Sequence, residues 1–381
     1  MPTAHSHEKK IRVLIVDDSA YMCRVLRDIL SADPQLEVVG QGRDGRDAVA
    51  MAESLRPDVI TMDINMPHID GLQATELIMS QHPRPIVIVS SESREGAAST
   101  LRALELGAID FVSKPSSGID LDMRAVRDEL TRKIKLAAKV RVVRTATRSK
   151  SSPPAASVAA AARLEAPNHR AGIAGSAAAS STGAQFPIVV IAASTGGPAA
   201  VSKLVADLPK DLAAAVIVVL HMPAAFTQPF IAQLSEISAL PVKEAELNDM
   251  LQPATIYVCP GSSHLRLSSG GKIILDQGAR IDGYRPCANV ALETIAACAR
   301  SFTIAVILTG MGNDGSKGAL AVKSAGGYVL AQDEATSMIF GMPAEAIKAG
   351  AVHEVLPLRD IPAAIEKRVA KLARATLVGA R

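Results

Sequence analysis

Aromatic residues are scarce in this chain of 381 residues, where they make up 3% of the sequence and tryptophan is absent. A hydrophobic core must therefore be built from aliphatic side chains. Four cysteines are present, at positions 23, 259, 287 and 298, and none of them forms a C-x-x-C pair. Their spacing is too wide for a usual zinc site and is typical of buried thiols in a cytosolic protein.

Long hydrophobic runs are also absent. No strictly apolar run approaches the roughly 18 residues that a membrane-spanning helix needs. The N-terminal segment, Met1 to Lys10, lacks the apolar region of a secretory signal. We therefore expect a cytoplasmic protein without membrane insertion. Apolar residues still make up 48% of the chain, and two domains are expected at roughly 100–200 residues per domain.

Acidic residues are almost missing from residues 132–184, where ten Lys and Arg stand against one Glu. From about Thr145 to Ala184 the sequence is rich in Ala, Ser, Pro and Gly and has no apolar periodicity, which is typical of a flexible linker. A basic linker can also bind nucleic acid, but no aromatic residues alternate with these charges, which favours a solvated tether. We place the linker at residues 131–185, between domains at 9–130 and 186–375.

Strand and helix signals alternate in both halves. Short apolar runs such as Ile11–Val16, Val59–Met62 and Ile86–Val89 are typical of parallel strands buried on both faces. The alternation restarts after the linker, and only His264–Leu275, with a Ser-Ser-Gly-Gly centre, predicts a hairpin instead. The expected fold is α/β, with two doubly wound parallel-sheet domains, flavodoxin-like and then Rossmann-like with a β-hairpin, joined by a flexible linker.

Charged and polar residues directly follow the predicted strands of the first domain. Asp17 and Asp18 follow one strand, Asp63 another, and Ser90 and Lys114 two more. Because the carboxyl ends of parallel strands share one sheet edge, these side chains should converge. Three carboxylates together need a cation, and oxygen ligands suit Mg²⁺. One carboxylate could then attack a phosphoryl group, with the lysine balancing charge and the serine bonding a phosphoryl oxygen.

These residues resemble the receiver domain of bacterial response regulators, over about residues 11–130. The matching pieces are Val16-Asp17-Asp18-Ser19, Asp63-Ile64-Asn65-Met66-Pro67 with Asp70-Gly71, Val89-Ser90 and Phe111-Val112-Ser113-Lys114-Pro115. The resemblance implies that a histidine kinase phosphorylates Asp63. It also implies a Mg²⁺ site and a phosphorylation switch. The implied ligands are Asp17, Asp18, Asp63 and the backbone carbonyl of Asn65, and the switch residues are Ser90, Phe111 and Lys114.

A second constellation begins where the strand Ile188–Ala193 leads into Ser194-Thr195-Gly196-Gly197-Pro198. A strand, a Gly-rich turn and a helix place Ser194 at the sheet edge, facing helix N–H groups. This segment alone fits two interpretations. One is a phosphate or dinucleotide cradle, although G-x-G-x-x-G is missing; the other is a nucleophilic serine with an oxyanion hole.

His221 favours the nucleophile, because it directly follows the next buried strand, and Asp314 lies in a glycine-rich loop after a later one. The three can share one sheet edge, with Ser194 as nucleophile, His221 as base and then acid, and Asp314 orienting the imidazole. Further candidates are the N–H groups near Thr195 and Met311 as oxyanion donors and His264 as a rival base.

This half resembles the catalytic domain of the chemotaxis receptor methylesterases, over about residues 186–375. The matching pieces are Ser194-Thr195-Gly196-Gly197, His221-Met222-Pro223, Pro260-Gly261, Arg285-Pro286, Thr309-Gly310-Met311-Gly312-Asn313-Asp314-Gly315 and Phe340-Gly341-Met342-Pro343. The resemblance implies hydrolysis of glutamate methyl esters on chemoreceptors, releasing methanol, and deamidation of receptor glutamines. It implies no cofactor for the hydrolase, and we expect the unphosphorylated receiver domain to cover the catalytic edge.

The sequence departs from this family at two places. Ala192 stands where the family usually has Gly, and Cys287–Leu292 has C-A-N-V-A-L where the family typically has S-V-D-V-L-F. Three other functions remain as alternatives. A DNA-binding regulator would need a helix-turn-helix, which the pattern lacks, so we expect no DNA partner. A nucleotide-dependent enzyme would use the Ser194 loop as a cradle. The third is a non-catalytic or differently specific output in another chemosensory pathway.

Overall fold

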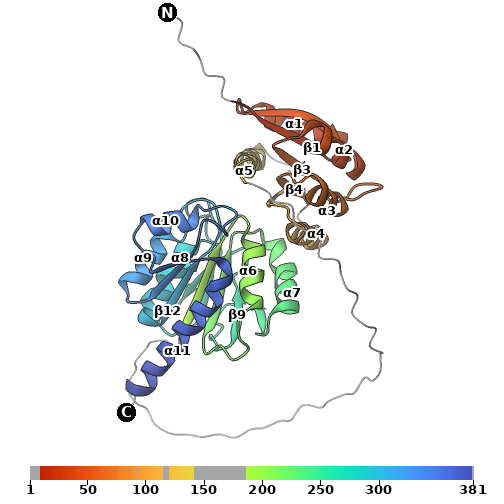
Figure 1. Ribbon diagram of the computed structural model, residues 1–381. Helices are drawn as coiled ribbons and strands as arrows, with labels where there is room; N and C mark the ends of the chain where they lie inside the picture. Colours follow the sequence, from red (N-terminus) through yellow and green to blue (C-terminus); the bar gives the residue numbers. More distant parts are fainter. Residues whose placement is uncertain (1–8, 92, 115–119, 141–185, 380–381) are drawn as a thin grey trace, which may run out of the picture.

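The computed structural model describes residues 9–91, 93–114, 120–140 and 186–379, which form two α/β domains (Figure 1). Each has a parallel sheet with helices on both faces, so the expected α/β class is confirmed. Most of the linker expected at 131–185 lies outside the described residues. Among the described helices, none is long and apolar enough to cross a membrane.

Strands and helices alternate through the first domain. In chain order they are β1 (Ile11–Val16), α1 (Ala20–Ser31), β2 (Leu36–Gly42), α2 (Gly45–Leu55), β3 (Val59–Met62), α3 (Gly71–Gln81), β4 (Ile86–Ser90), α4 (Arg94–Glu105), β5 (Asp110–Ser113) and α5 (Asp120–Ala137). Helices α1 to α4 each begin after a Ser or Asp whose side chain accepts a hydrogen bond from a first-turn N–H group.

The strands of this domain pair in parallel in the order β2-β1-β3-β4-β5. Helices α1 and α5 cover one face of the sheet and α2, α3 and α4 cover the other. This order brings the carboxyl ends of β1, β3, β4 and β5 to a common edge. The polar residues Asp17, Asp63, Ser90 and Lys114 follow or end these strands, and the fold therefore gathers them.

Helix α5 continues to Ala137, beyond the domain boundary expected at residue 130. Ile134 and Ala137 are fully buried against the sheet, together with Leu130. The basic residues on the same stretch belong to the helix, and one of them, Lys135, pairs with Asp33 at 2.6 Å. The positive charges of this stretch occupy the other faces of an amphipathic helix.

The second domain contains a larger sheet and a hairpin. Its elements are β6 (Ile188–Ala193), α6 (Gly197–Ala206), β7 (Ala215–Leu220), the 3-10 turn η1 (Ala224–Phe226), α7 (Thr227–Ile237), β8 (Val242–Glu244), β9 (Thr255–Val258), β10 (His264–Leu267), β11 (Ile273–Asp276), α8 (Ala288–Ala299), η2 (Arg300–Phe302), β12 (Thr303–Ile307), α9 (Ser316–Ser324), β13 (Tyr328–Gln332), α10 (Met342–Lys348), β14 (Glu354–Leu356), η3 (Leu358–Asp360) and α11 (Ile361–Gly379).

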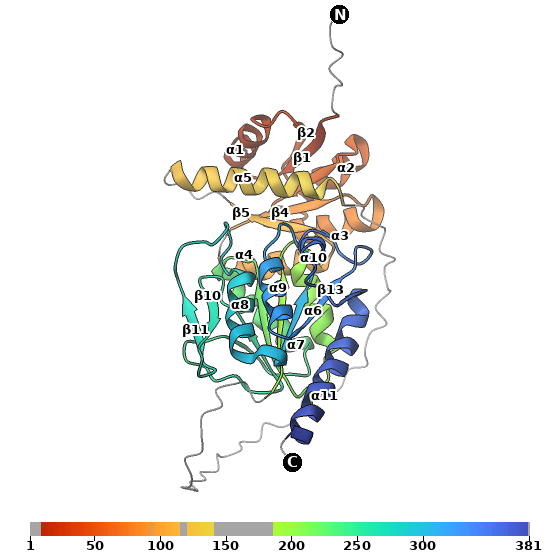
Figure 2. The same cartoon turned by 90° about the vertical axis from the view of Figure 1, so that its left-hand side faces the viewer.

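Within the described residues, this sheet has the parallel strand order β14-β13-β12-β6-β7-β9-β8, and β10 and β11 form the predicted hairpin beside it. Helices α6, α7 and α11 lie on one face, and α8, α9 and α10 on the other (Figures 1 and 2). The winding changes direction at β6, which pairs with β12 on one side and β7 on the other. Such a switch point opens a crevice at the carboxyl ends of the strands.

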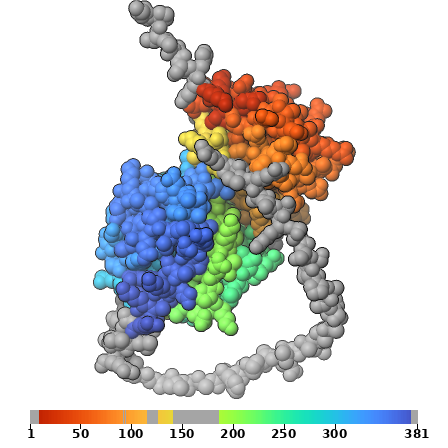
Figure 3. Space-filling view, in the orientation of Figure 1, coloured from red at the N-terminus to blue at the C-terminus, as the bar shows by residue number. Residues whose placement is uncertain are grey.

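The first domain rests on this crevice edge (Figure 2). Helix α4 contacts η1, α6 and α7, and Phe111 of β5 stacks on Phe226 of η1 with ring centroids 4.2 Å apart. A single cluster of buried apolar side chains continues from one domain into the other, and the two surfaces meet in the space-filling view (Figure 3).

Candidate active site

Ser194 lies directly after β6, at the switch point of the second sheet. Its N–H group donates to the carbonyl oxygen of Thr309 at 3.0 Å, which ties it to the end of β12. The turn that follows passes through Gly196, whose φ of +73° lies in the left-handed region. Helix α6 then begins without a side-chain cap. Its first turn therefore keeps the positive end of the helix dipole beside Ser194.

His221 and Asp314 form a buried pair. His221 follows β7 directly, and its Nε2 lies 2.8 Å from Oδ2 of Asp314. The two side chains are 11% and 1% exposed, so little water screens the contact. With Nε2–H donating to the carboxylate, Nδ1 is the nitrogen that can take a proton. Nδ1 is buried and has no hydrogen-bond partner among the described residues, Ser194 included, a common state of catalytic groups before substrate binds.

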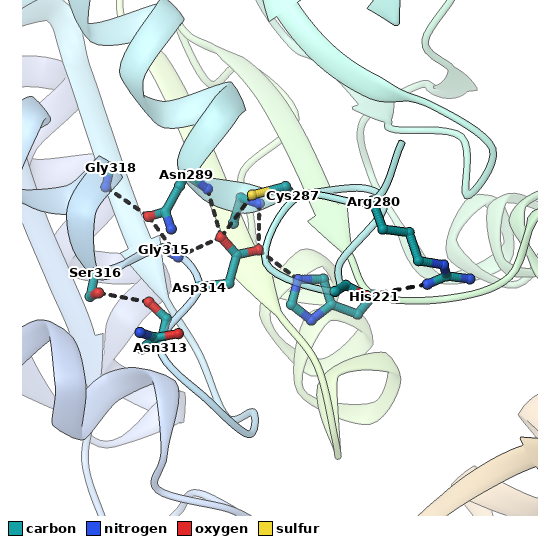
Figure 4. A network of polar contacts seen from close by, with 11 residues as sticks. His221, Arg280, Cys287, Asn289, Asn313, Asp314, Gly315, Ser316 and Gly318 are labelled. Atoms are coloured by element: carbon teal, nitrogen blue, oxygen red, sulfur yellow. Dashed lines mark hydrogen bonds and ion pairs between the residues drawn. The ribbon is translucent and has the colours of Figure 1, made fainter. Parts of the chain in front are cut away.

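The carboxylate of Asp314 is held by donors from two helix starts (Figure 4). At the start of α8, the N–H groups of Ala288 and Asn289 donate to it at 2.6 and 2.9 Å, and Cys287 Sγ lies 3.2 Å away. The N–H group of Gly315 adds a further bond of 2.9 Å. Burial alone would raise the pKa of Asp314, but the bonds from His221 and the backbone outweigh it and lower that pKa. Asp314 is therefore ionised where it contacts the His221 imidazole.

A cavity of about 580 Å³ contains both Ser194 and His221 on its wall. The loop 277–285 closes one side, and Tyr284 from this loop stacks on His221 with ring centroids 4.3 Å apart. The first domain closes another side with residues of β5 and α5, among them Asp110 and Arg132. The expectation that the first domain covers the catalytic edge agrees with this arrangement.

The two candidate oxyanion residues are contacted directly by the first domain. Thr195 Oγ1 donates to Asp110 Oδ2 at 2.6 Å, and Arg132 Nη1 approaches Met311 Sδ at 2.6 Å. Asp110 also accepts from Lys133 Nζ at 3.1 Å. Among the described residues, no acceptor takes the backbone N–H of Thr195 or of Met311, so both donors remain for a substrate oxygen.

His264 does not take part in this constellation. Its side chain is fully buried, and Nε2 bonds to the carbonyl oxygen of Ala279 at 3.0 Å. It therefore anchors the loop 277–285 and is a poor alternative to His221 as base. Ala192 likewise lies in the core, where its methyl group joins the cluster under α8 rather than the cavity wall.

The acidic residues of the first domain gather as expected. One oxygen from each of Asp17, Asp18 and Asp63 lies within 4.8 Å of the others. Lys114 Nζ lies 2.9 Å from both Asp17 Oδ2 and Asp63 Oδ2 and offsets part of their charge. Burial raises the pKa of Asp63; Lys114 opposes this shift and Asp17 adds to it. Three carboxylates of mixed exposure suit the hard oxygen coordination of Mg²⁺.

The predicted switch residues occupy defined positions. Ser90 Oγ lies 3.3 Å from the carbonyl oxygens of Ser91 and Gly96, so its hydroxyl bonds into the start of α4. Phe111 is 5% exposed and fills the domain interface, where Lys133 Nζ lies 5.0 Å from its ring centroid. The switch aromatic therefore connects the first domain to Phe226 of the second.

Sequence reasoning missed three residues that the structure places at the site: Asp110, Tyr284 and Asn289. Asn289 Oδ1 accepts from the N–H groups of Gly315 and Gly318 at 3.0 and 2.8 Å and so fixes the Asp314 turn. Tyr284 carried one usable signal, since it is an aromatic residue next to the Arg285-Pro286 motif in a chain with few aromatics. Asp110 had none, because its role depends on domain docking.

Comparison with known proteins agrees with both halves. The model of the CheB methylesterase family matches residues 189–365, and that of the response regulator receiver domain matches residues 13–126. The protein-glutamate methylesterase/protein-glutamine glutaminase of Symbiobacterium thermophilum is 42% identical over 95% of this chain and 98% of its own length. The protein of the same name from Thermotoga maritima is 42% identical over 93% and 97%.

Two solved structures match one domain each. The CheB methylesterase catalytic domain of Thermotoga maritima is 43% identical, covers 48% of this chain and 98% of its own, and has a TM-score of 0.47. The response regulator domain of Thermotoga maritima CheB is 50% identical, covers 35% and 99%, and has a TM-score of 0.33. Given the near full-length identity to the relatives above, this chain belongs to the protein-glutamate methylesterase/protein-glutamine glutaminase family, with a receiver domain followed by a CheB methylesterase domain.

Proposed function

We propose that this chain is a phosphorylation-activated serine hydrolase. It removes methyl groups from glutamate methyl esters of chemoreceptors, releasing methanol, and deamidates specific receptor glutamines to glutamate. The observation that carries the proposal is the buried His221–Asp314 pair on the wall of the cavity that also contains Ser194. A non-catalytic output would have no use for an ionised aspartate held by four hydrogen-bond donors behind an imidazole.

Each residue of the triad has a defined step. Ser194 Oγ attacks the ester carbonyl carbon while His221 Nδ1 takes its proton, and the Asp314 carboxylate stabilises the imidazolium. The N–H groups of Thr195 and Met311 donate to the oxyanion. The imidazolium then protonates the departing methanol, or ammonia from a glutamine. Water, deprotonated by the same imidazole, then attacks the acyl carbon. The imidazolium returns this proton to Ser194 Oγ as the ester bond to the serine breaks, and glutamate is released.

The receiver domain accepts the regulating phosphoryl group on Asp63. A carboxylate oxygen of Asp63 attacks the phosphorus of a phosphohistidine on a histidine kinase, and the histidine leaves. Asp17, Asp18, Asp63 and the carbonyl of Asn65 would hold Mg²⁺, which when bound neutralises charge on the phosphoryl group. Lys114, already 2.9 Å from Asp63, pairs with the added charge. Because the phosphodonor is a kinase, we propose the cytoplasm as the place of action.

The receiver domain restricts access to the active site until this reaction occurs. Asp110 and Arg132 contact the two oxyanion residues, and Phe111 stacks on Phe226. A phosphoryl group on Asp63 offers Ser90 a stronger acceptor than its present carbonyl partners, and that rearrangement reaches Phe111 on the neighbouring strand β5. Loss of the aromatic stack would weaken the interface, within the usual allosteric range of about 1–3 kcal/mol.

Methanol release from methylated chemoreceptor membranes tests this function. The full chain is assayed with Mg²⁺, before and after a small-molecule phosphodonor, beside Ser194→Ala and Asp63→Asn. We expect release that rises with the phosphodonor, none from Ser194→Ala, and an unresponsive basal rate from Asp63→Asn. Release from Ser194→Ala at the wild-type rate would reject the nucleophile. Wild-type release that does not change with the phosphodonor would reject activation by phosphorylation but would leave the hydrolase assignment in place.

A further inference from the structure

We propose that Tyr284 is a positioning residue for His221. Its ring holds the imidazole in the plane in which Nε2 reaches Asp314 while Nδ1 is left for Ser194. This inference rests on the proposed function, because it assigns a role within the same triad. The observation behind it is a face-to-face contact between the two rings, with centroids 4.3 Å apart and an interplanar angle of 19°.

The imidazole needs such a second constraint. Its only hydrogen bond is the one to Asp314 at 2.8 Å, and its other nitrogen has no partner among the described residues. A ring held by one bond can still tilt about that bond, and a tilt moves Nδ1 relative to the nucleophile. A flat ring stacked on the imidazole face restricts this tilt without competing for either nitrogen.

Tyr284 is itself held firmly. Its backbone exchanges two hydrogen bonds with Ile281, of 2.9 and 3.0 Å, which close a tight turn. His264 bonds to Ala279 at 3.0 Å and Arg285 Nη1 to Gly278 at 2.9 Å, so the loop 277–285 is anchored at its base. The ring is therefore carried by a braced turn, as a positioning role requires.

Glycine at position 312 leaves room for this ring. A Cβ atom on Gly312 would lie 2.2 Å from the Tyr284 hydroxyl, and the φ of Gly312 is +85°. Tyr284 is thus packed between the His221 imidazole and the loop that carries Met311 and Asp314. One side chain contacts the base on one side and the loop of its orienting aspartate on the other.

The ring rather than the hydroxyl carries the role. Among the described residues, Tyr284 Oη makes no hydrogen bond, and burial raises the pKa of Tyr284, so the phenol is neutral. The π face of a neutral aromatic ring is compatible with the imidazolium that forms during catalysis. Phenylalanine should therefore substitute for Tyr284, whereas an aliphatic side chain should not.

A matched control exists in the same domain. Tyr328 stacks on His353 with centroids 4.5 Å apart and the same 19° angle, and neither residue lines the cavity. Tyr328→Leu thus removes an equivalent ring contact away from the reacting groups. A loss of activity that follows only from Tyr284→Leu then reports the position of the base and not the general loss of a stacked tyrosine.

The test uses the full chain with Mg²⁺ and the phosphodonor, and two readouts. The first is kcat and KM for methanol release; the second is the rate at which phenylmethanesulfonyl fluoride, a small serine-directed reagent, inactivates Ser194. For Tyr284→Leu we expect kcat to fall about tenfold to a hundredfold with KM unchanged, and inactivation to slow in parallel. Tyr284→Phe should stay within about threefold of wild type, and Tyr328→Leu should match wild type in both readouts.

Three results would overturn the proposal. One is wild-type kcat in Tyr284→Leu; another is a raised KM with unchanged inactivation, which would make Tyr284 a substrate contact; the third is a Phe variant as impaired as Leu. If Tyr284→Leu does not fold, judged by thermal unfolding, Tyr284→Met carries the same expectations. Failure of the proposed function looks different, because wild type would then release no methanol or Ser194→Ala would retain the activity.

Discussion

At the scale of single residues, the most consequential group is the carboxylate of Asp314. Backbone N–H groups and Cys287 surround it, so only an acceptor fits there. Burial and, to a smaller extent, the charge of Asp314 raise the pKa of Cys287 to about 12. The thiol is therefore a neutral donor that supports the aspartate.

Asp314→Asn tests what the carboxylate contributes to catalysis and to stability. The amide nitrogen must face either the backbone donors or His221, so we expect kcat for methanol release to fall about 10³–10⁴-fold. The pKa of Asp314 is lowered in the folded state, so its stabilising effect is present above the unfolded pKa of about 4 and is lost as pH falls further. Unfolding by urea should accordingly show the largest deficit of the variant at neutral pH. The exposed Asp360→Asn is the control, and an equal deficit there would contradict the assignment.

For Asp63 we expect the opposite effect of the charged carboxylate on the free energy of unfolding. Burial raises its pKa, so the folded state disfavours the charged form. Asp63→Asn should therefore raise the free energy of unfolding at neutral pH without Mg²⁺, by on the order of 1 kcal/mol or a few degrees in Tm. The gain should shrink as pH falls through the raised pKa toward about 4, where wild type is protonated too. Thermal unfolding checks this, and a variant less stable than wild type at pH 7 would refute it.

The sequence predicted the residues that directly follow buried strands, and Asp314 in its glycine-rich loop, but missed residues whose placement depends on how separate segments pack. Ser194, His221 and Asp63 each come directly after a buried strand, and a parallel sheet gathers such positions whatever the loops do. Tyr284 reaches the site through the turn at 281–284, and Asn289 acts from the first turn of α8, where it accepts from Gly315 and Gly318. Neither the composition of that turn nor that of the start of α8 indicates which side chain will face the site.

At the scale of elements, the catalytic edge depends on a close approach between β6 and the loop after β12. A Cβ atom on Gly310 would lie 2.8 Å from Ser194 Cβ and 2.4 Å from Met342 Sδ. The carbonyl of Thr309 takes the Ser194 N–H just before this point. The two strand ends can therefore share one crevice only because residue 310 has no side chain.

Gly310→Ala should therefore displace the nucleophile. We expect a loss of stability of about 1–3 kcal/mol from overpacking and a drop in kcat of at least about tenfold. Gly270→Ala is the matched control, because only Ser268 Oγ lies within 4 Å, at 3.9 Å, of an added Cβ there. Methanol release and thermal unfolding of both variants test whether the close approach at residue 310 positions Ser194. If Gly310→Ala kept wild-type kcat, the close approach would have no catalytic importance.

Strongly patterned elements were predictable and weakly patterned ones were not. The hairpin at β10 and β11 and the aliphatic strands β1, β3 and β7 follow from short apolar runs. Strands β2 and β8 were not singled out, because both are edge strands with several partly exposed residues. Helix α5 extends past the domain boundary expected at residue 130, because Leu130, Ile134 and Ala137 form a buried stripe among basic neighbours.

At the scale of the whole molecule, composition predicted two domains, and the expectation that the receiver domain covers the active site came with a family resemblance. Neither predicted which contacts hold the two domains together. Asp110 bridges the domains through Thr195 and lies at the start of β5, where no sequence signal marks it. Arg132 belongs to a stretch whose basic composition suggested a linker. Its contact with Met311 appears only once α5 is extended over the crevice of the second domain.

Arg132 therefore offers a direct test of the gate. Arg132→Ala leaves the triad intact and removes the contact from α5 to Met311, so the closed arrangement should become less favourable. We expect the rate of methanol release without phosphodonor to rise about fivefold, while the fully phosphorylated rate stays near wild type, so that the activation ratio falls. Arg127→Ala, on an exposed site of the same helix, should change neither rate. An unchanged basal rate in Arg132→Ala would show that this contact does not hold the domains closed. A fall in both rates would instead mean that Arg132 assists catalysis, because a group that only stabilises the covered state cannot slow the phosphorylated enzyme.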